Sequence, residues 1–216
     1  MVFRTKAQGG AIAPVLVLAH GAGAPADSPF MELLAAALSA QGVTTVRFEF
    51  PHMEKRRIDG KRRPPDRQPA LLEHFRKVIA ETYAGSDAQA GVFVGGKSMG
   101  GRMASLLAAE AGIEETVRGA VCFGYPFHPP GKRDQWRTDH FPTLRRPIQI
   151  IQGTRDPFGK KADVDARHLQ ELANVNLAWL EGGDHDYKPL ARQSETREDL
   201  IRQAAATAAS FMMDEE

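Results

Sequence analysis

The stretch VFVGGKSMGG, residues 92–101, decides how this chain of 216 residues is interpreted. Three apolar residues lead into Gly96-Lys97-Ser98-Met99-Gly100, which matches the pattern G-x-S-x-G. The residues that follow, 102–109, have a composition that favours a helix. The order therefore predicts a strand, a sharp turn and a helix, with the hydroxyl of Ser98 held on the turn.

A serine on such a turn needs donors for the negative charge that develops on the group it attacks. Met99, the first residue of the predicted helix, is expected to offer its backbone N–H. A second donor is expected from the loop His20-Gly21-Ala22-Gly23-Ala24, which follows the apolar run 14–19. Its small residues let the backbone fold back, and we assign the N–H of Ala22 to this role. An ordinary glycine-rich turn before a helix would look the same.

A competing interpretation concerns the same stretch. Residues 91–98 also match G-x-x-x-x-G-K-S, the phosphate-binding loop of nucleotide hydrolases. In such a loop the first glycine follows a strand, yet here residues 92–94 are themselves strand-like and residues 84–90 are no buried strand. We therefore favour the serine turn, and a nucleotide-binding protein stays the alternative.

Composition narrows the range of partners. The chain has 28 Lys and Arg against 27 Asp and Glu, a formal net charge of +1, which gives no global argument for binding nucleic acid or an anionic membrane. The single cysteine, Cys122, lies in an apolar run, and no apolar run reaches 18 residues. The first residues do not resemble a secretion signal. We expect a soluble, cytoplasmic protein that needs no cofactor or metal.

Apolar runs and helical patterns alternate along the chain. This alternation predicts a mostly parallel sheet of about six strands with helices on both faces, a three-layer α/β fold, in a single domain spanning 1–216. The expected strands are 14–19, 44–50, 92–94, 119–124, 147–153 and 175–180, and the expected helices include 29–41, 71–83, 161–172 and 198–213.

Two segments between these elements are candidates for contact with a substrate. Residues 51–67 carry seven Lys or Arg and three Asp or Glu, which is typical of a solvated loop, although this loop leaves the carboxyl end of a strand. Arg62 and Arg63, braced by two prolines, are the candidates to bind a carboxylate or phosphate, and His52 is a third. Residues 125–146, which begin with the substrate candidate Tyr125, form a connection long enough to act as a lid.

An acid and a base follow two later strands. Asp156 comes after the expected strand 147–153 and His185 after 175–180, so the chain order is Ser98, Asp156, His185. Asp134 and Asp139 are alternative acids. In this arrangement His185 would remove the Ser98 proton and the acid would orient the imidazole ring.

These features together resemble the α/β-hydrolase superfamily over nearly the whole chain. The closer resemblance is to a small branch, similar to dienelactone hydrolases, that groups bacterial hydrolases with testis-expressed proteins and a subunit of the nonspecific lethal chromatin complex. It is carried by the runs 47–51, 60–65, 95–102 and 125–132. The resemblance implies a Ser98 nucleophile, a His185 base and an Asp156 orienter. Dienelactone hydrolases themselves use a cysteine at the position of Ser98.

The sequence thus predicts a serine hydrolase that cleaves a small-molecule ester through an acyl-enzyme. The alternative is a binding or scaffold module without catalysis, which the resemblance to a chromatin-complex subunit permits. A complete set of serine, acid and histidine favours the enzyme.

Overall fold

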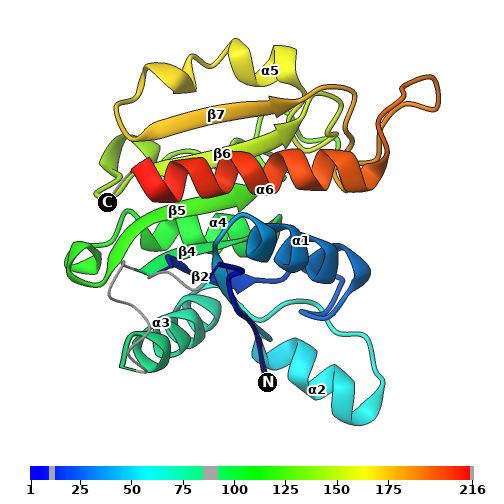
Figure 1. Cartoon of the computed structure of the whole chain (residues 1–216). Helices are drawn as coiled ribbons and strands as arrows, with labels where there is room; N and C mark the ends of the chain where they lie inside the picture. The colour runs from blue at the N-terminus through cyan, green and yellow to red at the C-terminus, as the bar shows by residue number, and fades with distance from the viewer. Residues whose placement is uncertain (10–12, 85–91, 215–216) are drawn as a thin grey trace.

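A seven-stranded sheet runs through residues 1–9, 13–84 and 92–214, which are the residues that this computed structural model describes (Figure 1). The strands lie in the order β1-β3-β2-β4-β5-β6-β7; β1 is antiparallel to β3 and the other pairs are parallel. Their bounds are β1 Val2–Thr5, β2 Val15–Ala19, β3 Thr44–Phe48, β4 Val92–Lys97, β5 Val117–Phe123, β6 Ile148–Gly153 and β7 Val175–Leu180. Every residue of β2, β3, β4 and β6 is buried, as expected where helices cover both faces.

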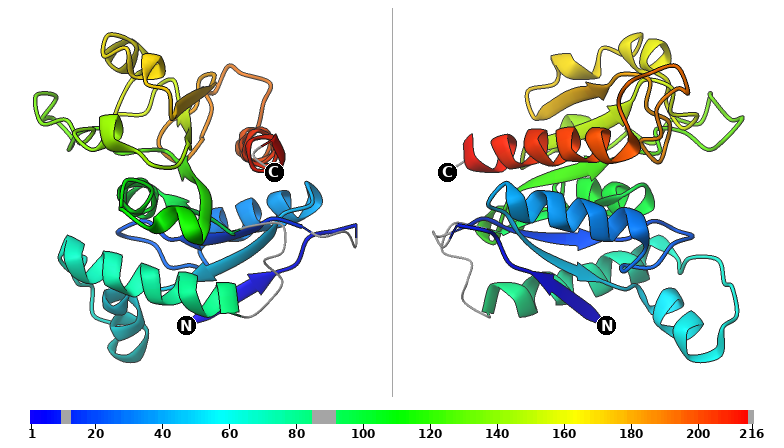
Figure 2. Two further views of the ribbon diagram at one scale, coloured as in Figure 1. Left: turned by 90° about the vertical axis from the view of Figure 1, so that its left-hand side faces the viewer. Right: turned by 45° about the vertical axis from the view of Figure 1, so that its right-hand side comes forward.

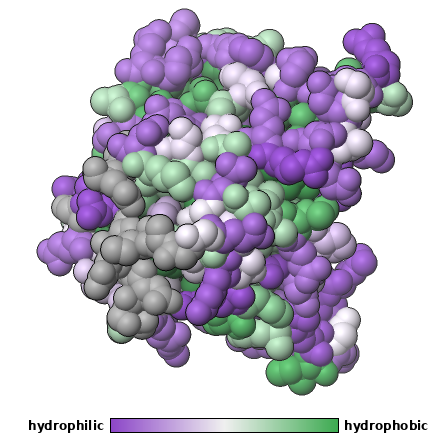
Figure 3. Space-filling model, viewed as in Figure 1, coloured by the Kyte–Doolittle hydropathy of each residue, from purple (hydrophilic) through white to green (hydrophobic). Residues whose placement is uncertain are grey.

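Helices lie on both sides of the sheet (Figure 2). One apolar cluster places α1 (Pro29–Ala40) and α6 (Arg197–Asp214) on one face; the other places α3 (Gln68–Ala84), α4 (Met99–Leu107) and α5 (Lys161–Asp165) on the opposite face. The surface seen from the side of α1 and α6 is mostly hydrophilic, with small scattered apolar patches (Figure 3). Among the described residues we find no helix that combines the length and apolar character needed to cross a membrane. The predicted three-layer α/β fold is confirmed.

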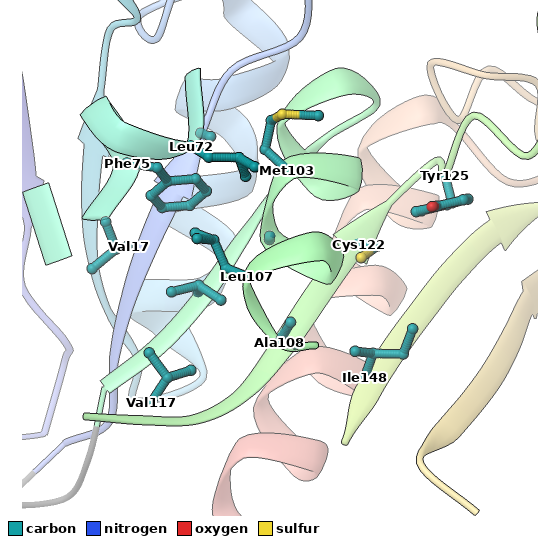
Figure 4. Packing of buried hydrophobic residues seen from close by; sticks show 14 of the residues in the cluster. Val17, Leu72, Phe75, Met103, Leu107, Ala108, Val117, Cys122, Tyr125 and Ile148 are labelled. Atoms are coloured by element: carbon teal, nitrogen blue, oxygen red, sulfur yellow. The ribbon is translucent and has the colours of Figure 1, made fainter. Parts of the chain in front are cut away.

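The core beneath α3 and α4 is built from residues at helical spacing. Leu72 and Phe75 of α3 and Met103 and Leu107 of α4 lie between these helices and the sheet, where they approach Val17 of β2 (Figure 4). All five are buried, and burying one such side chain contributes about 1.5–3 kcal/mol. This packing fixes α4 against β4, and with it the turn that joins them.

Three details differ from the sequence-based expectation. The sheet has a seventh strand, because the short segment Val2–Thr5 pairs with β3 at the edge; its residues are only partly buried, so no apolar run marked it. Residues 51–67, expected as a loop, begin with helix α2 (Pro51–Asp59), which has proline in its first turn and ends at Gly60 with φ of 71°. The helix expected over 161–172 ends at Asp165 and is followed by a 3₁₀ turn, Leu169–Glu171.

The direction in which successive strands are added to the sheet reverses after β3. The chain passes from β2 outward to β3 and then returns to β4 on the other side of β2. The carboxyl ends of β2 and β4 therefore flank the crevice where open α/β sheets bind ligands. The loop that begins at His20 follows β2, and Ser98 follows β4.

Two glycines allow β2, β4 and α4 to come into contact there. A Cβ on Gly96 would lie 2.4 Å from the carbonyl carbon of Gly100 and 2.7 Å from the oxygen of Ala19. A Cβ on Gly100 would lie 2.5 Å from that same Ala19 oxygen. These neighbours are backbone atoms, which cannot rotate out of the way, so the close approach depends on both glycines.

We predict that Gly100→Ala lowers the free energy of unfolding by about 1–3 kcal/mol or more, because the added methyl group overlaps the backbone of β2. Urea unfolding followed by circular dichroism measures this change. Gly23→Ala is the matched control, since a Cβ there has open space and the φ of Gly23 is not positive. Equal stability of the two variants would contradict the proposed packing constraint.

Candidate active site

Ser98 lies on the turn between β4 and α4 in a backbone conformation that L residues rarely adopt, with φ of 52° and ψ of −113°. Its N–H donates to the carbonyl of Phe123 at 3.0 Å, and its carbonyl accepts the N–H of Arg102 at 3.0 Å. Such strain costs on the order of 1–3 kcal/mol and persists only where the surroundings impose it. The side chain is half-buried, with its hydroxyl beside His185.

The phosphate-loop interpretation requires a loop where the structure has β4. Residues 92–97 are a fully buried strand that pairs with β2 and β5. Gly91, the first glycine of that match, and most of the segment before it lie outside the described residues.

Ser98, His185 and Asp156 form a continuous hydrogen-bonded line. His185 Nε2 lies 2.9 Å from Ser98 Oγ, and His185 Nδ1 lies 2.7 Å from Asp156 Oδ2. Asp156 is fully buried, and the His185 side chain is 20% exposed. Since a carboxylate can only accept, Nδ1 carries the proton toward Asp156 and Nε2 is left as the acceptor for the Ser98 hydroxyl. The alternative acids Asp134 and Asp139 are both exposed.

The loops that carry the acid and the histidine are fixed by local contacts. Asp156 Oδ1 accepts the N–H of Phe158 at 2.8 Å, and the Phe158 ring lies 4.4 Å from the imidazole of His185. Tyr187 is buried, and its hydroxyl donates to the carbonyl of Ile151 in β6 at 2.7 Å. These contacts join the loop after β7 to β6 and hold both functional groups in register.

His20 orients the loop that contains Ala22. The N–H of Phe50 donates to His20 Nε2 at 3.0 Å, so Nε2 is unprotonated and Nδ1 donates to the carbonyl of Gly21, which lies 2.6 Å away. The peptide between Gly21 and Ala22 is planar, so a carbonyl held toward His20 directs the N–H of Ala22 the opposite way. Ala22 lines the same pocket as Ser98. The role of Ala22 and Met99 as oxyanion donors stays a proposal.

A pocket of about 330 Å³ opens above Ser98. Its wall includes Ala22, Ser98 and Met99, together with Pro126 and Arg137 from the segment 125–146. The first four residues of that segment are buried, so it is anchored at its start. Its action as a lid stays a prediction. The volume is at the lower end of the range for small-molecule sites.

The four residues predicted to contact substrate lie outside the wall of this pocket. Arg62 is exposed. Arg63 donates from both terminal nitrogens, one to each carboxylate oxygen of Asp59, which is the last residue of α2. His52 is buried behind the wall, with Nδ1 3.4 Å from Asp66 Oδ2. Tyr125 is buried, and its hydroxyl donates to the carbonyl of Arg137 at 2.8 Å.

The charged residues that do line the pocket were not predicted from the sequence. Arg102 and Arg137 line the pocket, and so does Asp66. Arg102 had a usable signal, because it lies four residues after Ser98 on a predicted helix and hence close to the turn. Arg137 had none, since its position follows from the path of a long irregular connection.

We predict that His20 makes stability depend on pH. Burial lowers its pKa from 6.5 to about 4. Between these values the unfolded chain binds a proton that the folded chain does not, so the free energy of unfolding falls as the pH drops from about 6.5 to about 4. The difference between the two pKa values corresponds to about 3 kcal/mol. Urea unfolding across this range should show a flatter profile for His20→Gln than for the wild type; parallel profiles would contradict the assignment.

Comparisons with known proteins agree with this architecture. The chain matches the α/β hydrolase domain family over residues 13–213. Similar solved structures include Est1E from Butyrivibrio proteoclasticus (TM-score 0.69, 14% identity, covering 99% of this chain and 93% of that one) and dienelactone hydrolase from Anabaena variabilis (0.70, 21%, 99% and 90%). A putative α/β hydrolase from Agrobacterium tumefaciens is also similar (0.71, 14%, 99% and 91%). The link to testis-expressed proteins and the chromatin-complex subunit stays a prediction. Because the family match spans most of its length, the chain belongs to the α/β hydrolases.

Proposed function

We propose that this α/β hydrolase is a serine hydrolase that cleaves a small carboxylic ester, or a related acyl bond, through an acyl-enzyme. The observation that carries the proposal is the hydrogen-bonded line from Ser98 Oγ through His185 to Asp156, with distances of 2.9 and 2.7 Å. Both distances are within hydrogen-bond reach, as a nucleophile, a base and an orienting acid require. The proposed substrate is a small molecule because the adjoining pocket holds about 330 Å³.

The first half of the reaction forms the acyl-enzyme. Ser98 Oγ attacks the ester carbonyl carbon while His185 Nε2 takes the hydroxyl proton. The carbonyl oxygen becomes an oxyanion, which the N–H groups of Met99 and Ala22 stabilise. The oxyanion collapses, the bond to the alkoxy group breaks, and the leaving oxygen takes the proton from His185. Asp156 stays ionised and stabilises the imidazolium that forms between these steps.

The second half returns the enzyme to its starting state. Water gives a proton to His185 and attacks the acyl carbon. The second oxyanion occupies the same donors, and Ser98 leaves with the proton from His185. The net reaction consumes one ester and one water and releases an alcohol and a carboxylic acid.

The buried contacts around the two loops support this assignment over a scaffold. Asp156 is completely buried, and its carboxylate is directed at the histidine and at the N–H of Phe158. Ser98 is held at a positive φ, which a protein without a use for that hydroxyl could relieve with glycine. A non-catalytic binding module has no need for either feature, and it stays the alternative that the experiments below distinguish.

We predict that a fluorophosphonate probe forms its adduct on Ser98. Mass spectrometry of the digested protein should place the adduct on the peptide that contains residue 98, with fluoride as the leaving group. Ser98→Ala should not react at this position and should lose ester hydrolysis. Ser105→Ala is the control, since Ser105 lies buried on the same helix and should not affect labelling. A scaffold would show neither labelling nor turnover.

A second prediction concerns the acid. In Asp156→Asn the amide can donate to His185 and favour the wrong ring tautomer, so kcat should fall on the order of 10³–10⁴-fold. Asp139→Asn is the control and should retain activity. Rates are measured with a 4-nitrophenyl ester, and circular dichroism checks that both variants fold. Retention of most of the activity by Asp156→Asn would rule out its orienting role.

A further inference from the structure

Two arginine side chains line the pocket beside Ser98, and neither has a carboxylate partner among the described residues. Arg102 lies on α4 one turn after Ser98, and Arg137 belongs to the segment between β5 and β6. Natural proteins rarely bring two guanidinium groups together in a partly buried site without an acid between them, because like charges repel and burial disfavours charge. Such a pair therefore indicates a function.

Arg102 is held in place but its charge is not neutralised. Its Nη2 donates to the amide oxygen of Gln68 at 3.0 Å. Its Nε is buried and has no hydrogen-bond partner among the described residues. Its backbone N–H donates to Ser98, and the helix thus fixes the distance between this side chain and the serine.

Arg137 is fixed through its backbone rather than through its guanidinium. The Tyr125 hydroxyl donates to its carbonyl at 2.8 Å, and its N–H donates to the carbonyl of Phe127 at 2.8 Å. Within the described part of the chain its guanidinium makes no hydrogen bond or ion pair. Burial, and then the nearby charge of Arg102, lower the pKa of Arg137 from its usual value.

The charges of the pocket wall do not balance. Asp66 is the acid among the lining residues, and it already accepts the backbone N–H of His52 at 2.9 Å. His140 lies close enough to Arg102 for the two to interact, and burial lowers its pKa to about 4, so it is neutral near pH 7. Two cations and one anion leave about one positive charge facing the pocket.

We propose that Arg102 and Arg137 form a binding subsite for a carboxylate on the substrate, so that the preferred substrates are small esters that carry one free carboxylate. This inference rests on the proposed function and identifies its substrate class. Arginine pairs with a carboxylate through two parallel hydrogen bonds, and a partly buried pair is screened less than an exposed one. A carboxylate carries one charge and matches the residual charge of the wall, whereas a phosphate carries about 1.5–2.

The subsite also assigns a role to Tyr125. By holding the carbonyl of Arg137, its buried hydroxyl fixes the place from which that side chain enters the pocket. In this proposal Tyr125 is a positioning residue that acts through Arg137.

The test compares 4-nitrophenyl hemiadipate, which has a free carboxylate, with its neutral methyl ester. We expect kcat/KM for the anionic ester, divided by kcat/KM for the neutral one, to fall about tenfold or more in Arg137→Gln and in Arg102→Gln. Arg133→Gln is the matched control, because Arg133 lies on the same segment with its side chain 64% exposed, and it should keep the wild-type ratio. Hydrolysis by Ser98→Ala gives the background.

The outcomes distinguish failure of the carboxylate subsite from failure of the proposed hydrolase function. If the ratio is the same in the wild type and in both arginine variants while hydrolysis depends on Ser98, the subsite is wrong and the hydrolase stands. If neither ester is hydrolysed, the proposed function fails, and calorimetry with monomethyl adipate then tests the subsite alone. Binding to the wild type that is lost in Arg137→Gln supports the subsite. Equal binding to both proteins, or no binding to either, overturns it. Stronger inhibition by inorganic phosphate than by monomethyl adipate would reject the carboxylate assignment.

Discussion

The close contact of β2, β4 and α4 is the constraint on which the site depends. No Cβ fits at Gly96 or Gly100, so the backbone of the helix starts directly against Ala19. The chain must therefore reverse direction within one residue, and Ser98 takes the positive φ that this requires. The strain at Ser98 is offset by the buried packing of α4 on the sheet. The packing of α4 against the sheet therefore also sets the orientation of Ser98.

Hydrogen bonds and ring contacts fix the loops that follow the strands at the carboxyl edge of the sheet. His20 is neutral because it accepts from Phe50 and is buried, and its remaining proton holds Gly21. On the other side, Phe158 and Tyr187 connect the loops after β6 and β7. Loops at the carboxyl edge are otherwise free to vary, so these contacts determine whether Ser98, Asp156 and His185, which follow three different strands, meet within hydrogen-bond distance.

Elements with strong local signals could be predicted from the sequence. Apolar runs, and for residues 44–50 an alternating pattern, predicted the six parallel strands. The serine turn and its two later partners predicted the residues that the structure brings together. The edge strand Val2–Thr5 could not be predicted, because an edge strand needs only one partner and little burial. Helix α2 was hidden by its charges, although Pro51 and Gly60 mark its ends. The structure gives the positions of Ala22, Met99 and the segment 125–146, but their roles as oxyanion donors and as a lid stay proposals.

The two pairs of arginines show why charge in a sequence is a poor guide to charge in a pocket. Arg62 and Arg63 belong to a cluster of cations, but the cluster also contains acids, and Asp59 at the end of α2 pairs with Arg63. Arg102 and Arg137 are 35 positions apart, by subtraction of their numbers, and no pattern joins them. The start of α4 and a long irregular connection bring them to one partly buried pocket, where Asp66 is the acid among the lining residues and water screens charges less. In the proposed subsite, the cations that bind the ligand are the two that have no carboxylate partner among the described residues. Arg63, by contrast, is paired with Asp59.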